Sequence, residues 1–350
     1  YGDERRTTIS PVSGEVDIED LIPEEESLLT MTRLGYIKRQ AADTYSAQNR
    51  GGRGIKGMTT REEDVPERMF MCSSHDHVMF FTSAGRVYRI KCYEVPEGSR
   101  TSKGMNIVNL LPITSDEKVT AMIRVGEIED DRYLCMVTKQ GVLKRTRLDA
   151  FRNVRKGGLI AIDLDEGDEL VRVLDTDGYS ELLVATRNGM AIRFNENDAR
   201  VIGRTARGVK ALNLAEGDSV IGMVACDPCK KLLTVTETGY GRLSELSDYR
   251  VQSRGGKGLT NYHTESFGCV AAIAMVDETE DVLLVSSDGI MIRLHADSVR
   301  LCRRPSKGVR LMRLQEGVTV VSMVQTARDD SEEVAVPEEA EPDADEAPAD

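Results

Sequence analysis

The chain has 350 residues, of which 40% are hydrophobic, 30% charged and 5% aromatic, and it contains no Trp. This balance is typical of a folded globular protein and excludes a chain that is disordered throughout. No apolar run approaches the roughly 18 residues of a membrane span, and Tyr1 opens directly into polar sequence. We therefore expect a cytoplasmic protein with no membrane partner.

The formal net charge of −13 is unevenly distributed. Residues 1–27 hold nine acidic and two basic residues, and residues 329–350 hold eleven acidic and no basic residues. Between these ends, residues 28–328 carry a net charge of +5. We expect a basic folded body, 28–328, between an acidic N-terminal linker, 1–27, and a disordered acidic C-terminal tail, 329–350.

Six copies of one local pattern follow each other, each an apolar stretch that ends in Thr or Ser and a tight turn. The apolar stretches begin at Leu28, Val78, Leu134, Leu182, Leu232 and Val282, and the turn glycines are Gly35, Gly85, Gly141, Gly189, Gly239 and Gly289. The glycines are 50, 56, 48, 50 and 50 residues apart, which suits the blades of a propeller.

The turns themselves are typical of β-hairpins. Asn188-Gly189 and Asp288-Gly289 are dipeptides in which Gly supplies the positive φ of a tight hairpin turn. Short alternating strands such as 190–194 and 290–294 follow, and no segment has a long helical period. The sequence predicts an all-β fold, a propeller-like disc with six blades of four strands each.

A basic residue followed by Gly recurs farther along each repeat, 19 residues from the turn Gly to the second Gly in five repeats and 16 in the third. The pairs are Arg53-Gly54, Lys103-Gly104, Lys156-Gly157, Arg207-Gly208, Lys257-Gly258 and Lys307-Gly308. A second column lies four residues after the turn Gly: Arg39, Arg89, Arg145, Arg193 and Arg293, with Arg242 one place early. Scattered surface charges rarely recur at one position of a repeat, so both columns predict a functional basic track.

The strongest local motif is the loop Gln48-Asn-Arg-Gly-Gly-Arg-Gly54, followed by Lys56. Consecutive glycines let the main chain approach a phosphate, while arginines offer fork-shaped donors. Taken alone, such a loop is more often a glycine-rich turn with solvated arginines. The fifth repeat has 252–258 in the same register, with Arg254 and Lys257, and this repetition favours binding to a nucleic-acid backbone.

The sequence gives little support for metal binding, nucleotide binding or catalysis. Cys226 and Cys229 have the spacing of half a zinc site without a matching second pair, and His75 and His77 lack a third partner. The glycine spacing of 52–57 is that of a phosphate loop, but Met58 stands where Lys is required. No nucleophile or acid–base grouping is recognisable, so we expect no catalytic residue, metal or cofactor in this chain.

Residues 48–54 resemble the gyrase A box, the Gln-basic-Arg-Gly-Gly-basic-Gly heptad of the C-terminal domain of the DNA gyrase A family, which lies in the first of six repeats. The resemblance extends over residues 1 to about 328, and residues 1–7 resemble the chain that leaves the family's breakage-and-reunion region. It implies a β-pinwheel that wraps duplex DNA around its edge, so that gyrase introduces negative supercoils.

The resemblance also implies what lies elsewhere. The transesterifying tyrosine, ATP and Mg²⁺ would belong to the rest of an ATP-hydrolysing type II topoisomerase, so this chain by itself would not be an enzyme. Its partners would be duplex DNA, the remainder of the gyrase A protein as a homodimer, and the gyrase B protein in an A2B2 assembly. The location would be the bacterial cytoplasm, in association with the nucleoid.

The predicted DNA-binding residues combine the box and the two columns. They are Gln48, Asn49, Arg50, Gly51, Gly52, Arg53, Gly54, Lys56, Arg39, Arg89, Lys103, Arg145, Lys156, Arg193, Arg207, Arg242, Arg254, Lys257, Arg293 and Lys307. Asn49 departs from the family, which usually has a basic residue there. Two alternatives stay open: the C-terminal DNA-binding domain of the related topoisomerase IV protein, and a protein-interaction propeller.

Overall fold

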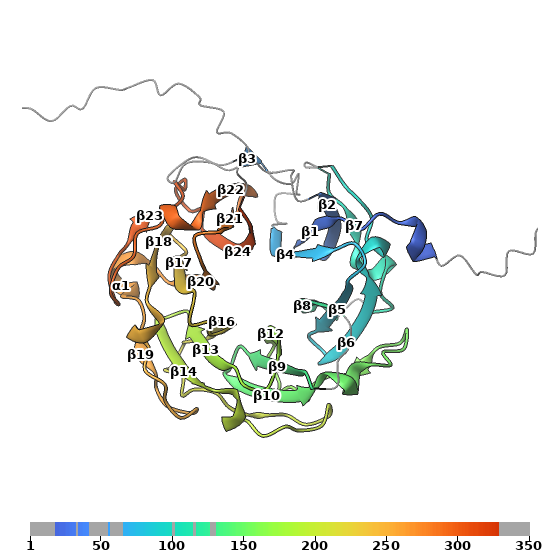
Figure 1. Ribbon diagram of the computed structural model, residues 1–350, viewed down its shortest axis with the longest axis horizontal. Coiled ribbons are helices and arrows are strands. Elements are labelled where there is room, and N and C mark those ends of the chain that lie inside the picture. Colours follow the sequence, from blue (N-terminus) through green and yellow to red (C-terminus); the bar gives the residue numbers. More distant parts are fainter. Residues whose placement is uncertain are drawn as a thin grey trace, which may run out of the picture.

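The computed structural model describes residues 18–32, 34–41, 55–56, 66–99, 102–114, 117–126 and 131–328. Within them, six four-stranded antiparallel sheets are arranged as blades around a central channel (Figure 1). The predicted all-β architecture of six four-stranded blades is confirmed. The acidic ends 1–17 and 329–350 lie outside the described residues.

Each blade is built on the hairpin that the repeat predicts. The hairpins are β1 (Glu26–Thr32) with β2 (Tyr36–Ala41), β5 (His77–Thr82) with β6 (Arg86–Lys91), β9 (Tyr133–Thr138) with β10 (Val142–Arg147), β13 (Glu181–Thr186) with β14 (Met190–Asn195), β17 (Lys231–Thr236) with β18 (Tyr240–Ser244), and β21 (Glu280–Ser286) with β22 (Ile290–His295). All six turn glycines have φ between 68° and 84°. This left-handed conformation is readily adopted by Gly, which lacks a Cβ.

The first strand of each hairpin is buried on both faces, because neighbouring blades cover both sides of its sheet. In β13, for example, all residues after Glu181 are buried. This explains why these strands read as continuous apolar runs and not as alternating ones. Next to them, the innermost strands surround the channel. They are β4 (Pro66–Ser73), β8 (Val119–Val125), β12 (Leu170–Thr176), β16 (Val220–Ala225), β20 (Val270–Val276) and β24 (Val320–Ala327).

The outermost strand of each blade comes from a different repeat. The two-residue strands β7 (Met105–Asn106), β11 (Leu159–Ile160), β15 (Val209–Lys210), β19 (Leu259–Thr260) and β23 (Val309–Arg310) each pair with the second hairpin strand of the preceding repeat. In the first repeat, β3 (Ile55–Lys56) pairs with β22 of the last repeat and so closes the ring. This exchange links each blade to the next by main-chain hydrogen bonds.

Short helical turns complete the repeats. They are the 3-10 turns η1 (Ile18–Leu21), η3 (Cys92–Glu94), η4 (Ile107–Asn109), η5 (Leu148–Phe151), η6 (Glu196–Asp198), η7 (Leu246–Asp248) and η8 (Ala296–Ser298), and the α-helix α1 (Thr264–Phe267). The turn η1 and the residue after it contact the second blade and the turn that leads into it: Glu19 pairs with Lys91 Nζ at 2.6 Å, and the Ile22 carbonyl contacts His75 Nε2 at 2.9 Å.

The hydrophobic core is divided into clusters between neighbouring blades. Leu29 and Met31 of the first blade, for example, pack with Val78 and Phe80 of the second. Between the last and first blades, Leu283 and Val285 of β21 share a cluster with Leu28 and Met69. Apolar burial therefore supports ring closure alongside the pairing of β3 with β22.

Candidate nucleic-acid interface

The outer edge of the disc is formed by the outermost strands and the loops that lead into them. We call these segments the rim loops: 95–99 with 102–104, 152–158, 199–208, 249–258 and 299–308. Each begins after a 3-10 turn and ends where an outermost strand starts. In Figure 1 the outermost strands β7, β19 and β23 lie on the perimeter of the disc, away from the channel.

The rim loops from the third repeat onward are rich in cations. The loops 152–158, 199–208, 249–258 and 299–308 each contain three or four basic residues and no acidic residue. Among them, the exposed basic residues are Arg152, Arg155, Lys156, Arg200, Arg207, Arg250, Lys257, Arg300, Arg303 and Lys307. Such a chain of accessible cations along an edge is suited to the regularly spaced phosphates of a nucleic acid.

The last residue of a rim loop is a glycine for a steric reason. Gly104 and Gly308 have φ of 79° and 75°, and a Cβ built on them would lie 2.4 Å and 2.1 Å from a carbonyl oxygen of the preceding repeat. In the third repeat the corresponding glycine is Gly158, with φ of 73°, and not Gly157 as the sequence pairing predicted. Lys156 is therefore one residue farther from the outermost strand than the basic residue of the other loops.

Two cations of the predicted Lys-Gly column rest on aromatic rings of the preceding repeat. Lys103 Nζ lies 3.6 Å from the centre of the Tyr36 ring, and Lys307 Nζ lies 4.3 Å from that of Tyr240. Both tyrosines directly follow a turn glycine. The contacts place these ammonium groups at the edge of the disc while the cations keep part of their surface accessible.

Two other predicted cations of the rim loops, Arg207 and Arg254, make different contacts. Arg207 pairs with Asp165 of the preceding repeat. Arg254 donates from Nε to the Asp198 carbonyl at 2.9 Å and from Nη1 to the Lys210 carbonyl at 3.1 Å. Arg254 therefore connects two consecutive repeats, and this structural role is additional to any contact with DNA.

The arginine column at the turn Gly plus four is largely buried, which corrects the prediction of a second accessible track. Arg145 pairs with Glu196 at 3.1 Å, with side-chain exposures of 5% and 0%. Arg293, 6% exposed, donates to Asp281 at 2.8 Å and to the Ala327 carbonyl at 2.7 Å. A guanidinium buried against a carboxylate cannot reach a phosphate outside the protein, so both residues leave the candidate set.

The remaining residues of that column are partly covered. Arg193 donates to Glu181 at 2.7 Å and to the carbonyls of Leu246 and Tyr249, and its side chain is 16% exposed. Arg39, 14% exposed, lies 3.8 Å from Glu97. Burial lowers the pKa of Arg89. These contacts reach the next repeat for Arg193 and Arg39, which indicates a role in joining blades.

Arg242 does not belong to the arginine column. Leu243 takes the equivalent position, because it bridges Leu301 as Arg145 bridges Val201. Arg242 is 0% exposed and donates to the backbone and side-chain oxygens of Asn261. Its equivalents in the repeat are the buried Lys38 and Lys144, which donate to carbonyls of the next repeat, those of Ser99 and Arg204 respectively. Arg242 is therefore also removed from the candidate set.

The structure shows a third basic column, which the sequence analysis did not identify. Arg152, Arg200, Arg250 and Arg300 each lie eleven residues after a turn glycine and are exposed. Three of them precede residues that bridge the preceding blade, namely Val201, Val251 and Leu301. An alignment of the repeats on their turn glycines would have found this column.

The box residues Gln48, Asn49, Arg50, Gly51, Gly52, Arg53 and Gly54 lie outside the described residues. Lys56, however, belongs to β3, the strand that closes the ring on β22. In the described part of the chain, no group of three or more His, Cys, Asp or Glu residues could hold a metal ion. No described helix is long and apolar enough to cross a bilayer.

This arrangement defines a ring of β-blades whose repeats exchange their outermost strands, with cations along the outer loops. The family model described as "DNA gyrase C-terminal domain, beta-propeller" matches residues 26–65, 76–125, 132–177, 180–227, 230–265 and 280–327. The chain belongs to this family of DNA gyrase C-terminal domains.

Individual relatives indicate the same family. The chain is 50% identical over 210 residues to the DNA gyrase A protein of Clostridium acetobutylicum and 51% identical over 210 residues to that of Halalkalibacterium halodurans. These matches cover 60% of this chain and 25% of each relative, so the chain spans about a quarter of their length.

Among solved structures, a DNA gyrase A C-terminal domain matches with a TM-score of 0.79 and 25% identity, over 86% of this chain and 100% of that one. The C-terminal domain of a DNA topoisomerase IV matches with a TM-score of 0.67 and 24% identity, over 87% and 94% of the two chains, and shares the fold.

Proposed function

We propose that this chain binds duplex DNA along its rim loops and wraps it, as the DNA-wrapping part of a gyrase that introduces negative supercoils. The observation that carries the proposal is the recurrence of exposed cations at one position of successive rim loops, in the column Arg152, Arg200, Arg250 and Arg300. The relatives, which are DNA gyrase A proteins, support it.

The energetics of wrapping favour such a distributed site. Bending a DNA site of 20–30 base pairs by 40–90° costs on the order of 1–6 kcal/mol. Each phosphate that a Lys or Arg neutralises releases counterions, so many modest contacts along a curved edge offset the bending cost. Contacts to phosphates carry little sequence information, and we expect binding that depends strongly on salt and weakly on sequence.

The retained DNA-binding candidates are the accessible cations that recur at two positions of the rim loops, in the Lys-Gly column and in the column eleven residues after the turn glycine. They are Lys103, Lys156, Arg207, Lys257 and Lys307 together with Arg152, Arg200, Arg250 and Arg300. The box, 48–54, and Lys56 remain part of the proposal, because the box leads directly into β3. DNA bound there would pass the junction between the first and last blades.

The chain would work as part of a larger enzyme. We expect the remainder of the gyrase A protein, as a homodimer, together with the gyrase B protein to supply the cleavage chemistry, ATP hydrolysis and Mg²⁺ of a type II topoisomerase. This chain would contribute binding and bending in the bacterial cytoplasm, with no catalytic residue or cofactor of its own.

A topology measurement tests the proposal. The chain is bound to singly nicked plasmid at low and at high salt, the nick is sealed with ligase, and the linking number is measured after the protein is removed. We expect a shift from the protein-free distribution at low salt, lost at high salt. Binding without any shift would favour the topoisomerase IV alternative, and no binding would favour a protein-interaction propeller.

Two variants distinguish a specific effect of the rim loops on the linking number from a general effect of positive charge. The triple variant Arg200→Ala, Arg250→Ala, Arg300→Ala should lose most of the shift. The control Lys139→Ala, Arg187→Ala removes exposed cations that pair with Glu169 and Glu237 outside the rim loops, and should retain it. Equal loss in both variants would contradict a rim-specific track.

A further inference from the structure

The six innermost strands each place one residue at the same level of the channel. These residues pair with the hairpin residues four before the turn glycines. They are Arg68, Ala121, Arg172, Gly222, Ala272 and Ser322. Four of the six are small, and the arginines belong to the first and third blades.

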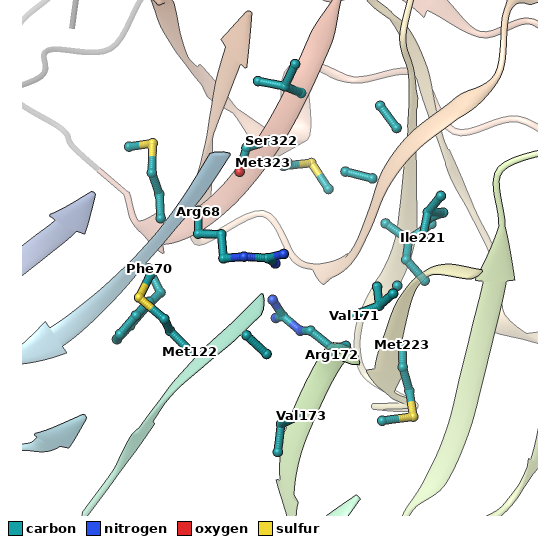
Figure 2. A pocket seen from close by; sticks show the side chains of 17 residues that line it. Arg68, Phe70, Met122, Val171, Arg172, Val173, Ile221, Met223, Ser322 and Met323 are labelled. Atoms are coloured by element: carbon teal, nitrogen blue, oxygen red, sulfur yellow. The ribbon is translucent and has the colours of Figure 1, made fainter. Parts of the chain in front are cut away.

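All six residues line a cavity of about 150 Å³ in the channel (Figure 2). Figure 2 shows the guanidinium groups of Arg68 and Arg172 pointing toward each other. Most of the surrounding side chains are apolar, among them Met122, Ile221 and Met223. Of the described residues that line this cavity, only the two arginines are charged.

Two facing cations repel each other, and the apolar wall strengthens that repulsion because it replaces part of the water around them. Arg172 is exposed to the channel, yet the protein groups around it remove part of its hydration. Desolvation and then the charge of Arg68 lower the pKa of Arg172. A guanidinium stays protonated at neutral pH, so the pair cannot relieve the repulsion by losing a proton.

From this geometry we infer that the channel binds a doubly charged tetrahedral oxyanion, such as inorganic phosphate, between Arg68 and Arg172. Its two negative charges match the two cations, and the fork of N–H donors on each guanidinium matches adjacent oxygens of such an anion. The cavity of about 150 Å³ is large enough for a small inorganic anion. The bound anion would connect β4 of the first blade to β12 of the third.

The site is separate from the rim loops, so its test is independent of DNA binding. The melting temperature of the whole chain is measured while inorganic phosphate replaces chloride at constant ionic strength. A saturating rise of roughly 2–4 °C is expected for the wild type, because an anion that binds only the folded state stabilises it. Arg172→Met should abolish this rise, and the rim variant Arg200→Met, which removes the same charge, should retain it. Arg172 is the residue to change because Arg68 takes part in further contacts.

Two further results bear on the inference. In phosphate-free buffer Arg172→Met should melt at or above the wild type, since the repulsion is gone. Crystals soaked in tungstate should show anomalous density between the two guanidinium groups. An equal phosphate response in Arg172→Met, or a lower melting temperature of that variant without phosphate, would overturn the inference.

Discussion

Lys103 Nζ lies 3.6 Å from the centre of the Tyr36 ring, so a cation of the second repeat rests on an aromatic ring of the first. The contact is at the edge of the disc, where β7 pairs with β2. It couples the position of a proposed DNA-binding cation to the joint between two blades.

A double-mutant cycle measures this coupling. Tyr36→Leu, Lys103→Met and the double variant should give an interaction free energy of about 0.5–1 kcal/mol in urea unfolding, the usual range for an exposed cation–π pair. Additive effects of the two substitutions would show that the ring does not hold the ammonium group.

The salt dependence of DNA binding should report the rim loops. Lys257→Ala and Lys307→Ala remove accessible cations, and each lost phosphate contact should reduce the slope of log K against log salt by about 0.9. Stability should change little for Lys257→Ala, because Lys257 is exposed. Fluorescence anisotropy with a DNA duplex at several salt concentrations gives the slope, and Arg187→Ala, outside the rim loops, should leave it unchanged.

Breaking the buried Arg145–Glu196 pair should lower stability without changing the salt dependence of DNA binding. Glu196 also accepts hydrogen bonds from Thr176 Oγ1 at 2.7 Å and from the Ser180 amide at 2.8 Å. Glu196→Ala leaves the Arg145 charge buried and uncompensated, and should lower the free energy of unfolding by about 3–5 kcal/mol. At a temperature where the variant is folded, its salt slope for DNA should equal that of the wild type; a reduced slope would return Arg145 to the candidate set.

Stability should depend on pH through two buried lysines. Burial lowers the pKa of Lys38 and of Lys144 from 10.5 to about 8, and for Lys144 the charge of Arg204 contributes further. Between these values the unfolded chain holds more protons than the folded one, so the contribution of these lysines to the free energy of unfolding rises with pH.

Comparison with a variant isolates this effect from other titrating groups. As pH rises from about 8 to about 10, the wild type should gain stability relative to Lys38→Met in urea unfolding. The exposed Lys139→Met removes the same charge and serves as the control, and the gain measured against Lys38→Met should exceed any change measured against it. A constant difference for Lys38→Met would mean that its pKa is not lowered.

Two glycines with the same backbone conformation allow two costs to be distinguished: that of a left-handed backbone and that of a steric clash with an added Cβ. Gly317 has φ of 78° and open space around a Cβ, whereas Gly308 has φ of 75° and a Cβ there would meet the Gly241 carbonyl. Gly317→Ala should cost about 1–2 kcal/mol for the left-handed conformation alone. Gly308→Ala should cost clearly more by thermal or urea unfolding, because β23 would have to move away from β18; equal costs would contradict this close approach.

The sequence by itself determined the repeat, the hairpins and the number of blades. These follow from local features: the positive φ of Gly189 suits a tight turn, and apolar runs such as 182–185 mark strands that are covered on both faces. The recurrence of Lys103 and Lys307 in a fixed register also followed from sequence alone, and both cations lie at the outer edge. The DNA contacts themselves stay a prediction.

The tertiary structure alone decided which cations are accessible. Arg145 and Arg200 are both basic residues at fixed positions of the repeat, yet one is buried against Glu196 and the other is exposed. Sequence spacing does not reveal this difference, because burial depends on the neighbouring repeat that supplies the outermost strand and its 3-10 turn. The facing of Arg68 and Arg172 is likewise a consequence of ring closure, which brings side chains 104 positions apart in the sequence to one channel.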